Sequence, residues 1–348
     1  MAVTIERLPA AEATPIGAFR ERRLRRGVTG DRTRTLDIGL VNNMPDAALL
    51  ATERQFAELL ASAAGDFAVR LHLYALGDVP RSAEGRSALA QGYSDARQLG
   101  ATRLDALIVT GAEPVAADIA EEPYWRALTE LIDWADANTF STILSCLAAH
   151  AGALHLGGAA RRTLQAKCSG IYAFETVARH RLLAGLEAGM TTPHSRRNGL
   201  DREDLARRGY QTLTCHAEIG VDIFVKQKRS LFVFMQGHPE YGRESLGREY
   251  RRDMGRFLQG ERDAPPPIPV NYFPAEIERS LAAFGARAIS ERRPQLMSEF
   301  PEAAVFGAGE TPWRKTAAQL YGNWLAIIAE RKAALREPAP IAAIRRGG

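Results

Sequence analysis

Short apolar runs alternate with longer amphipathic segments through the first half of the chain, and this alternation most constrains its fold. The apolar runs are typical of buried strands and lie at 36–41, 68–74, 106–109 and 140–144. The intervening segments 51–64 and 124–137 carry apolar residues at three- and four-residue spacing, as amphipathic helices do. This alternation predicts an α/β fold in which helices flank a mostly parallel sheet.

Polar or turn-forming residues follow three of these runs, at 42–45, at 110–114 and at Cys146. In a parallel sheet, the carboxyl ends of the strands meet at one edge, and active sites of this fold class lie outside that edge. We therefore expect a functional site where these three segments converge.

The second half of the chain has a different pattern. Segments 220–226 and 230–235 flank a short turn and predict a hairpin, and helical spacing follows at 244–258. A proline-rich connector near 263–269 leads to a last segment with one clear helix at 313–332. The sequence thus predicts a basic N-terminal arm (1–35), one domain (36–333) on which a C-terminal helical extension (265–333) packs, and a flexible tail (334–348).

Composition excludes several classes of protein. The 348 residues are 46% hydrophobic, enough for a sizeable core, and the three cysteines form no CxxC pair, which argues against a disulfide framework or a metal site. No secretory h-region and no apolar stretch near membrane-spanning length occurs, so we expect a cytoplasmic protein with no membrane partner. The net charge of +4 gives no reason to expect a nucleic-acid partner, although arginines crowd the segment 20–34.

Cys146 stands between an apolar run and a small-residue helical stretch, the position of a nucleophile on a strand-to-helix turn. A buried packing cysteine is the alternative, because free cysteine is among the most buried residue types. A cysteine nucleophile needs a base and a group that orients the base, and His238 and Glu240 offer both at the end of one strand. His150 is expected to point away from the thiol, and His194 is expected in a polar loop.

Several motifs taken together resemble the homoserine O-acyltransferases of methionine biosynthesis, also called homoserine transsuccinylases. The motifs are the thiol turn at Cys146, TPHSR at 192–196 with the preceding threonine, GHPEY at 237–241, EYRRD at 249–253, NYFP at 271–274 and the terminal WR and NWL. The resemblance runs from about residue 38 to residue 324 and rests on the order and spacing of the motifs.

The resemblance implies a class I glutamine-amidotransferase-like, flavodoxin-like fold used for acyl transfer from a coenzyme A thioester. Cys146 would carry the acyl group, His238 would be the base and Glu240 its orienting partner, in a ping-pong reaction that acylates L-homoserine. Lys167, Ser195 and Arg252 match the residues with which the family binds the acceptor. No cofactor is bound permanently; the partners are the two small-molecule substrates, and a homodimer is left open.

The chain departs from the family pattern at two places. The loop after the first strand lacks the family's lysine, so the oxyanion hole is expected from backbone amides at Leu147 and near Ala47. The position that separates succinyl from acetyl donors is Val115, which gives no carboxylate to repel a succinyl group and so favours succinyl, although Glu113 is a nearby acid.

Two other functions stay open from the sequence. A glutamine amidotransferase-type hydrolase could use the same three residues, but such enzymes typically have glycine two positions before and after the cysteine, where this chain has Leu144 and Ala148. Within the acyltransferases, L-serine or another hydroxy amino acid is an alternative acceptor, since one methylene gives a pocket only about 1–3 kcal/mol of discrimination.

Overall fold

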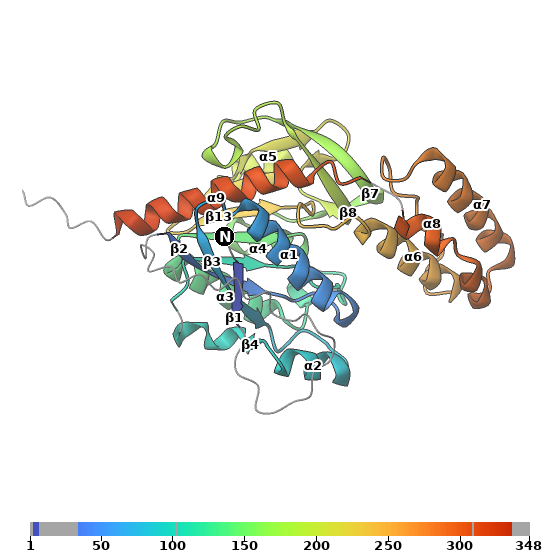
Figure 1. Cartoon of the computed structure of the whole chain (residues 1–348), viewed down its shortest axis with the longest axis horizontal. Coiled ribbons are helices and arrows are strands. Elements are labelled where there is room, and N and C mark those ends of the chain that lie inside the picture. Colours follow the sequence, from blue (N-terminus) through green and yellow to red (C-terminus); the bar gives the residue numbers. More distant parts are fainter. Residues whose placement is uncertain (1–2, 7–33, 102, 308–309, 336–348) are drawn as a thin grey trace, which may run out of the picture.

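The structure is a computed structural model that describes residues 3–6, 34–101, 103–307 and 310–335 (Figure 1). Within these ranges the main sheet has nine strands, in the order β1-β3-β2-β5-β6-β13-β12-β9, with β4 beside β3. Their bounds are β1 Val3–Glu6, β2 Thr35–Val41, β3 Ala68–Ala75, β4 Ser94–Asp95, β5 Ala106–Val109, β6 Ser141–Ser145, β9 Gln211–Thr212, β12 Ile223–Gln227 and β13 Leu231–Met235.

The main sheet is parallel from β1 through β6 to β13, and only β12 and β9 run antiparallel to their neighbours. The central strands β5, β6 and β13 are buried throughout, as expected for a sheet covered on both faces. The predicted α/β fold with a mostly parallel sheet and flanking helices is therefore confirmed, as is the hairpin of β12 and β13.

Helices cover both faces of the main sheet and enclose two apolar cores (Figure 1). On one face α1 (Leu49–Ala63) lies beside α9 (Arg314–Ala334), with Phe56 and Trp324 fully buried between them and the strands. On the other face lie α3 (Trp125–Asn138) and α4 (Leu147–Gly157). Two short helices, α2 (Ala83–Ala90) and α5 (Arg202–Arg207), complete this part of the fold.

A second, antiparallel sheet was not anticipated. It contains four strands in the described part of the chain: β7 (Arg162–Thr176), β8 (Met190–Gly199), β10 (Thr214–His216) and β11 (Gly220–Val221). The segment around His194, expected as a polar loop, is the middle of β8 and pairs with Gly170 in β7. The sequence analysis missed this strand because, apart from Met190 at its start, its buried residues are not large and apolar: they are Thr192, Pro193, His194, Arg196 and Gly199.

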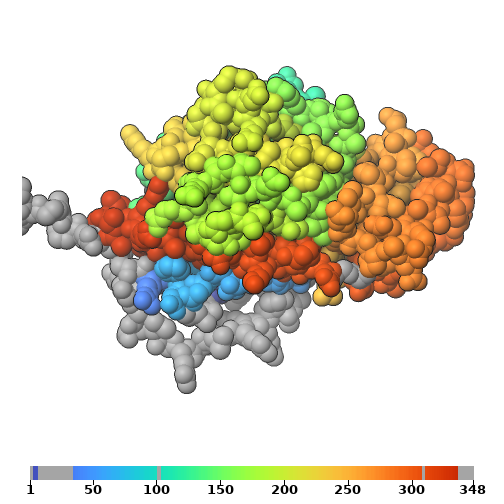
Figure 2. Space-filling model, turned by 90° about the horizontal axis from the view of Figure 1, so that it is seen from above, coloured from blue at the N-terminus to red at the C-terminus, as the bar shows by residue number. Residues whose placement is uncertain are grey.

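The C-terminal part divides into two structural units. Helices α6 (Ser245–Leu258), α7 (Ala275–Glu291) and α8 (Glu302–Gly307) form a lobe with its own apolar core at one end of the molecule (Figure 2). Helix α9 then returns to the main sheet. The predicted extension 265–333 therefore contributes both to this lobe and to the principal core.

The N-terminus adds an edge strand that the sequence had assigned to the basic arm. Residues Val3–Glu6 form β1 and pair in parallel with β3. Most of the predicted arm, including arginines 20–32, and all but the first two residues of the predicted tail lie outside the described residues. No helix in the described ranges has both the length and the apolar character required to cross a membrane.

Candidate active site

Cys146 occupies the turn between β6 and α4, at the carboxyl edge of the main sheet. Its backbone has φ 54° and ψ −114°, a conformation that costs energy for any residue other than glycine. The Cys146 amide donates to the Met235 carbonyl (2.8 Å), which anchors the turn to the end of β13. This sharp turn projects the side chain from the sheet edge, as nucleophiles on strand-to-helix turns require.

His238 and Glu240 lie next to Cys146 because β13 is the parallel neighbour of β6, with Met235 in register with Ser145. The imidazole Nδ1 of His238 donates to Glu240 Oε1 at 2.8 Å, and the Cys146 side chain lies close enough to the ring to influence its charge. The Tyr241 ring stacks on the imidazole at 4.1 Å. The structure thus brings the three predicted catalytic residues together in one chain of contacts.

The charges around His238 favour its protonated form. Burial by itself lowers the pKa of this imidazole, but Cys146 and Glu240 together outweigh burial and raise the pKa well above its ordinary value of 6.5. A cysteine beside a readily protonated imidazole is the arrangement in which a thiol becomes a nucleophilic thiolate.

A second histidine, His194, lies close to His238 and is fully buried. The His194 ring is 3.5 Å from Asp222 Oδ1 and accepts a hydrogen bond from Arg196 Nε. A Cβ atom at Gly237 would come within 2.6 Å of the His194 ring, so only glycine fits there. His194 therefore packs under the turn that carries His238.

The three predicted acceptor-binding residues converge from different elements on two carboxylates of α6. Lys167, on β7, lies 2.9 Å from Asp253 and 3.8 Å from Glu249. Ser195, on β8, donates its hydroxyl to Glu249. Arg252 lies on α6 itself and pairs with Asp253 at 3.0 Å, its side chain half exposed.

Glu249 and Asp253 hold this cluster together, and the sequence analysis proposed no role for either of them. Glu249 also accepts the Tyr241 hydroxyl at 2.5 Å, and the buried Asp253 also pairs with Arg262 at 2.7 Å. The sequence does contain a signal for both residues: they are four positions apart in the EYRRD motif and so share one face of the predicted helix. Together the cluster presents both positive and negative groups to one space.

A cavity of about 1100 Å³ connects Cys146 and His238 with this cluster. Its lining comes from the segments after β2 and β5, from α4, β7, β8 and α6, and from the turns beside them. Among the lining residues are Met44, Pro45, Gly111, Glu113, Leu147, His150, Arg161, Lys167, Ser195, Arg196, Arg197, Glu249, Arg252 and Arg256. His150, which the sequence analysis expected to point away from the thiol, also belongs to this lining. The cavity is large enough for two small-molecule substrates or for a long one.

Of the two residues predicted for the oxyanion hole, one lines the cavity and the other does not. Leu147 lines the cavity, and its amide stands so close to the turn after β5 that a Cβ at Gly111 would come within 2.9 Å of it. Ala47 is exposed on the short 3-10 helix Asp46–Ala48 and does not line the cavity. The reason is that Asp46 ties this loop to Arg81 (3.1 Å), so that Met44 and Pro45 face the cavity instead.

The predicted donor-selecting residues also differ from each other in position. Val115 is 63% exposed and does not line the cavity, because its amide is held by the Glu122 carboxylate (3.0 Å) and its side chain turns to solvent. Glu113 does line the cavity, but its carboxylate is paired with Arg256 at 2.6 Å. The acid near the donor position is therefore neutralised by a cation.

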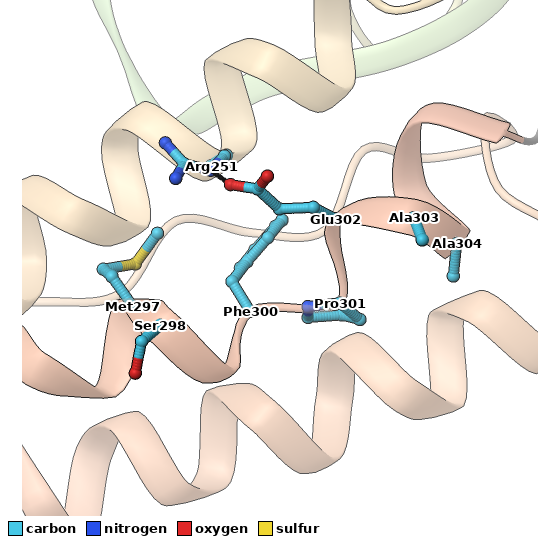
Figure 3. Close-up of a pocket in the computed structure, with 8 residues that line it drawn as sticks. All are labelled: Arg251, Met297, Ser298, Phe300, Pro301, Glu302, Ala303 and Ala304. Carbon is cyan, nitrogen blue, oxygen red and sulfur yellow. Dashed lines mark ion pairs between the residues drawn. The ribbon is translucent and has the colours of Figure 1, made fainter.

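A smaller hollow of about 590 Å³ lies in the C-terminal lobe (Figure 3). Its charged groups, Arg251 and Glu302, pair with each other, and apolar side chains such as Met297 and Phe300 line the rest. It contains no nucleophile or base, and we place the chemistry in the larger cavity. The described residues include no group of side chains able to hold a metal ion.

Comparison with known proteins shows which proteins the chain is similar to. A family model described as homoserine O-succinyltransferase matches residues 23–334. The homoserine O-succinyltransferase of Rhodopseudomonas palustris is 52% identical over 85% of this chain and 89% of that protein. Those of Methylorubrum extorquens and Bradyrhizobium japonicum are 48% and 46% identical, over 86% and 85% of this chain and 89% and 90% of their own lengths. Among solved structures, a glutamine amidotransferase of Thermotoga maritima covers 85% of this chain and 98% of its own, with 15% identity and a TM-score of 0.45.

Proposed function

We propose, because this chain belongs to the homoserine O-succinyltransferase family, that it transfers a succinyl group from a coenzyme A thioester to the hydroxyl of L-homoserine through Cys146. The observation that carries the proposal is the contact chain Cys146–His238–Glu240 at a cavity whose other end holds Lys167, Ser195 and Arg252. The names of the relatives favour succinyl over acetyl and L-homoserine over L-serine.

In the first half of the reaction, His238 takes the proton of the Cys146 thiol and the thiolate attacks the thioester carbonyl. The tetrahedral intermediate collapses with cleavage of the carbon–sulfur bond to coenzyme A, whose sulfur receives the proton from His238. One thioester replaces another, so little free energy separates the two and the protein mainly positions the groups. The acyl group then remains on Cys146.

In the second half, His238 takes the proton of the homoserine hydroxyl, and the oxygen attacks the acyl-Cys146 carbonyl. Cleavage of the carbon–sulfur bond releases the O-acyl ester, and the proton on His238 returns to the Cys146 sulfur. Glu240 holds the imidazole in the orientation that both steps use and stabilises its protonated form.

The oxyanion of both intermediates needs hydrogen-bond donors at the nucleophile. The Leu147 amide opens α4, where the first N–H groups of a helix have no intrahelical acceptor. The turn at Gly111, which approaches this amide closely, is the source of the second donor in this proposal and takes the role that the sequence analysis gave to Ala47. Removal of one such donor typically costs about 10²- to 10³-fold in rate.

The cluster on α6 suits an amino acid that carries both charges. Arg252 offers a planar pair of donors for the substrate carboxylate, with Lys167 next to it. Glu249, which now accepts the hydroxyls of Ser195 and Tyr241, offers a carboxylate for the substrate ammonium. Both groups of L-homoserine therefore find a partner of opposite charge.

Intact-protein mass spectrometry after mixing with succinyl-CoA tests the nucleophile. We expect one added succinyl group on the unaltered chain and on Cys215→Ser, and none on Cys146→Ser. Addition of L-homoserine should discharge the adduct, and L-serine should do so far more slowly. No adduct with succinyl-CoA, or an adduct that survives in Cys146→Ser, contradicts the mechanism; ammonia release from glutamine would support a hydrolase instead.

A further inference from the structure

His150 lies one helical turn beyond Cys146 and faces the same cavity. It is 4% exposed, lines the cavity, and its Nδ1 atom has no hydrogen-bond partner. Its amide donates to the Cys146 carbonyl at 3.3 Å, so the two residues are rigidly related. A buried polar atom without a partner costs free energy in the unliganded protein, and a ligand that supplies the partner recovers it.

Two arginines line the cavity around this histidine without a carboxylate partner. Arg161 donates to the Ala117 carbonyl, and the buried Arg196 donates to His194 and to the carbonyls of Asn198 and Ile219. Within the described ranges neither guanidinium forms an ion pair, whereas Lys167, Arg252 and Arg262 on the acceptor side all pair with Asp253. These two arginines therefore bring positive charges to the cavity lining that no ion pair in the described ranges offsets.

The imidazole itself is neutral. Burial, followed by the influence of Arg196 and Arg161, lowers the pKa of His150 to about 3. A neutral imidazole contributes one N–H donor and adds no charge. The three side chains thus combine hydrogen-bond donors with two positive charges, which suits a compact anion.

The distance from the nucleophile identifies which anion fits. A helix rises about 1.5 Å per residue, which places His150 roughly 6 Å along α4 from Cys146. The distal carboxylate of a succinyl group lies three carbon–carbon bonds from the thioester carbonyl, roughly 4 Å when extended with bonds of about 1.5 Å. With the carbon–sulfur bond added, the two spans are comparable.

We propose that His150, Arg161 and Arg196 form the binding site for the distal carboxylate of the acyl group and so select succinyl over uncharged acyl donors. The proposal rests on the proposed function and assigns the selection to residues outside the 113–115 segment. An uncharged donor of the same length leaves His150 Nδ1 without a hydrogen-bond partner and the two guanidinium groups without a counter-charge, which is the condition under which a site rejects an analogue strongly.

The test compares the rates at which acyl donors of matched length acylate Cys146. The reaction is stopped by rapid quench, and the adduct is measured by intact-protein mass spectrometry. Butyryl-CoA has the four carbons of succinyl-CoA without the carboxylate, and succinyl-N-acetylcysteamine keeps the carboxylate without the coenzyme A phosphates. We expect His150→Leu and Arg161→Gln to slow acylation by succinyl-CoA and by succinyl-N-acetylcysteamine about 10- to 100-fold, and to change the butyryl-CoA rate less than about threefold. Arg162→Gln, one residue along and paired with Asp201 outside the cavity, is the matched control and should change none of the rates.

Equal slowing with succinyl-CoA and butyryl-CoA, with succinyl-N-acetylcysteamine unaffected, would mean that these residues bind the coenzyme A phosphates and would overturn the inference. Unchanged succinyl rates in both variants would overturn it as well. Either result leaves the proposed function standing, because the unaltered chain would still form the succinyl adduct. Absence of that adduct overturns the proposed function and this inference with it.

Discussion

Cys146 holds an unfavourable backbone conformation because its neighbours on both sides are fixed. Residue 145 ends a buried strand, residue 147 starts a helix, and the Cys146 amide is bound to Met235. A positive φ at a residue with a Cβ atom stores roughly 1–3 kcal/mol, which the rest of the fold must supply. The strain is the consequence of pointing a side chain out of the sheet edge.

Cys146→Gly should therefore be more stable than Cys146→Ala, although both lack the thiol. Glycine adopts positive φ without steric cost, and after its greater loss of chain entropy we expect a net gain of about 1 kcal/mol in the free energy of unfolding. Urea unfolding of the two variants measures the difference. Equal stabilities would mean that the turn is not strained.

Glu240→Gln should lower the pKa of His238. The carboxylate is one of the two groups that overcome the effect of burial on this imidazole, so its removal moves the midpoint of His238 protonation to lower pH. The alkaline limb of the acylation rate should move the same way, and the rate should fall roughly 10²- to 10⁴-fold. Histidine NMR titration reports the midpoint.

Glu276→Gln, an exposed change on α7, is the control and should leave the His238 midpoint and the acylation rate unaltered.

The raised pKa of His238 also stabilises the folded protein. A raised pKa contributes stability that is complete below the ordinary value of 6.5 and is lost as pH rises through the raised value, and this contribution should shrink in Glu240→Gln. An unshifted midpoint would contradict the assigned role.

Helix α6 joins the C-terminal lobe to the cavity through two adjacent faces. Its apolar side, with Tyr250 and Met254, packs in the core of the lobe, and its polar side carries Glu249 and Asp253 to the cavity. The side chains of β7 and β8 reach these carboxylates from the second sheet. The position of this helix therefore determines the geometry of the acceptor cluster.

Asp253→Asn should destabilise the protein, because it leaves three cations without their shared carboxylate. Removal of one partner from a buried ion pair typically costs about 3–5 kcal/mol, and Asp253 is only 3% exposed. Urea unfolding at neutral pH measures the loss. Glu244→Gln breaks an exposed pair with Arg248 near the start of the same helix and should have little effect.

The same carboxylate gives stability a defined dependence on pH. Burial raises the pKa of Asp253, but Lys167 and Arg252 outweigh burial and hold it below 3.8. The stability that the Asp253 carboxylate contributes is therefore complete above pH 3.8. It is lost as the pH falls through the lowered pKa of Asp253 in the folded protein. The difference in unfolding free energy between the unaltered chain and Asp253→Asn should shrink under strongly acidic conditions; a constant difference would contradict the ion-pair explanation.

Helix α9 connects the end of the described chain to the centre of the molecule. Trp324 is fully buried against the main sheet, and its indole N–H donates to the Ser141 hydroxyl at 2.8 Å. Lys332, near the end of the helix, pairs with Asp105 at 2.5 Å beside the start of β5. The helix thus covers one face of the main sheet (Figure 1).

Trp324→Ala should lower the free energy of unfolding by about 3–5 kcal/mol, the usual cost of removing a large buried aromatic side chain. Trp324→Phe keeps most of the ring and loses the hydrogen bond to Ser141, so it should cost less. Thermal and urea unfolding of the pair provide the comparison. Similar stability of Trp324→Ala and the unaltered chain would show that α9 does not anchor the fold.

The sequence predicted what depends on local pattern. Periodicity gave strands β2, β3, β5, β6, β12 and β13 of the main sheet and helices α1, α3, α6 and α9, and chain topology brought the strand ends at Cys146 and His238 to one edge. Strand β8 was missed because its buried residues include Thr192, His194 and Arg196 and form no apolar run, and β1 because its four residues carry little pattern.

The sequence by itself therefore determined the α/β class, the family and the order of the catalytic residues, because each of these follows from spacing along the chain. Only the tertiary structure decided which side chains share the cavity: it brought in Glu249, Asp253 and His150 and left Ala47 and Val115 outside. The physical reason is that a side chain's direction depends on what anchors its backbone. Asp46 with Arg81, and Glu122 with the Val115 amide, are such anchors between residues that no local pattern connects.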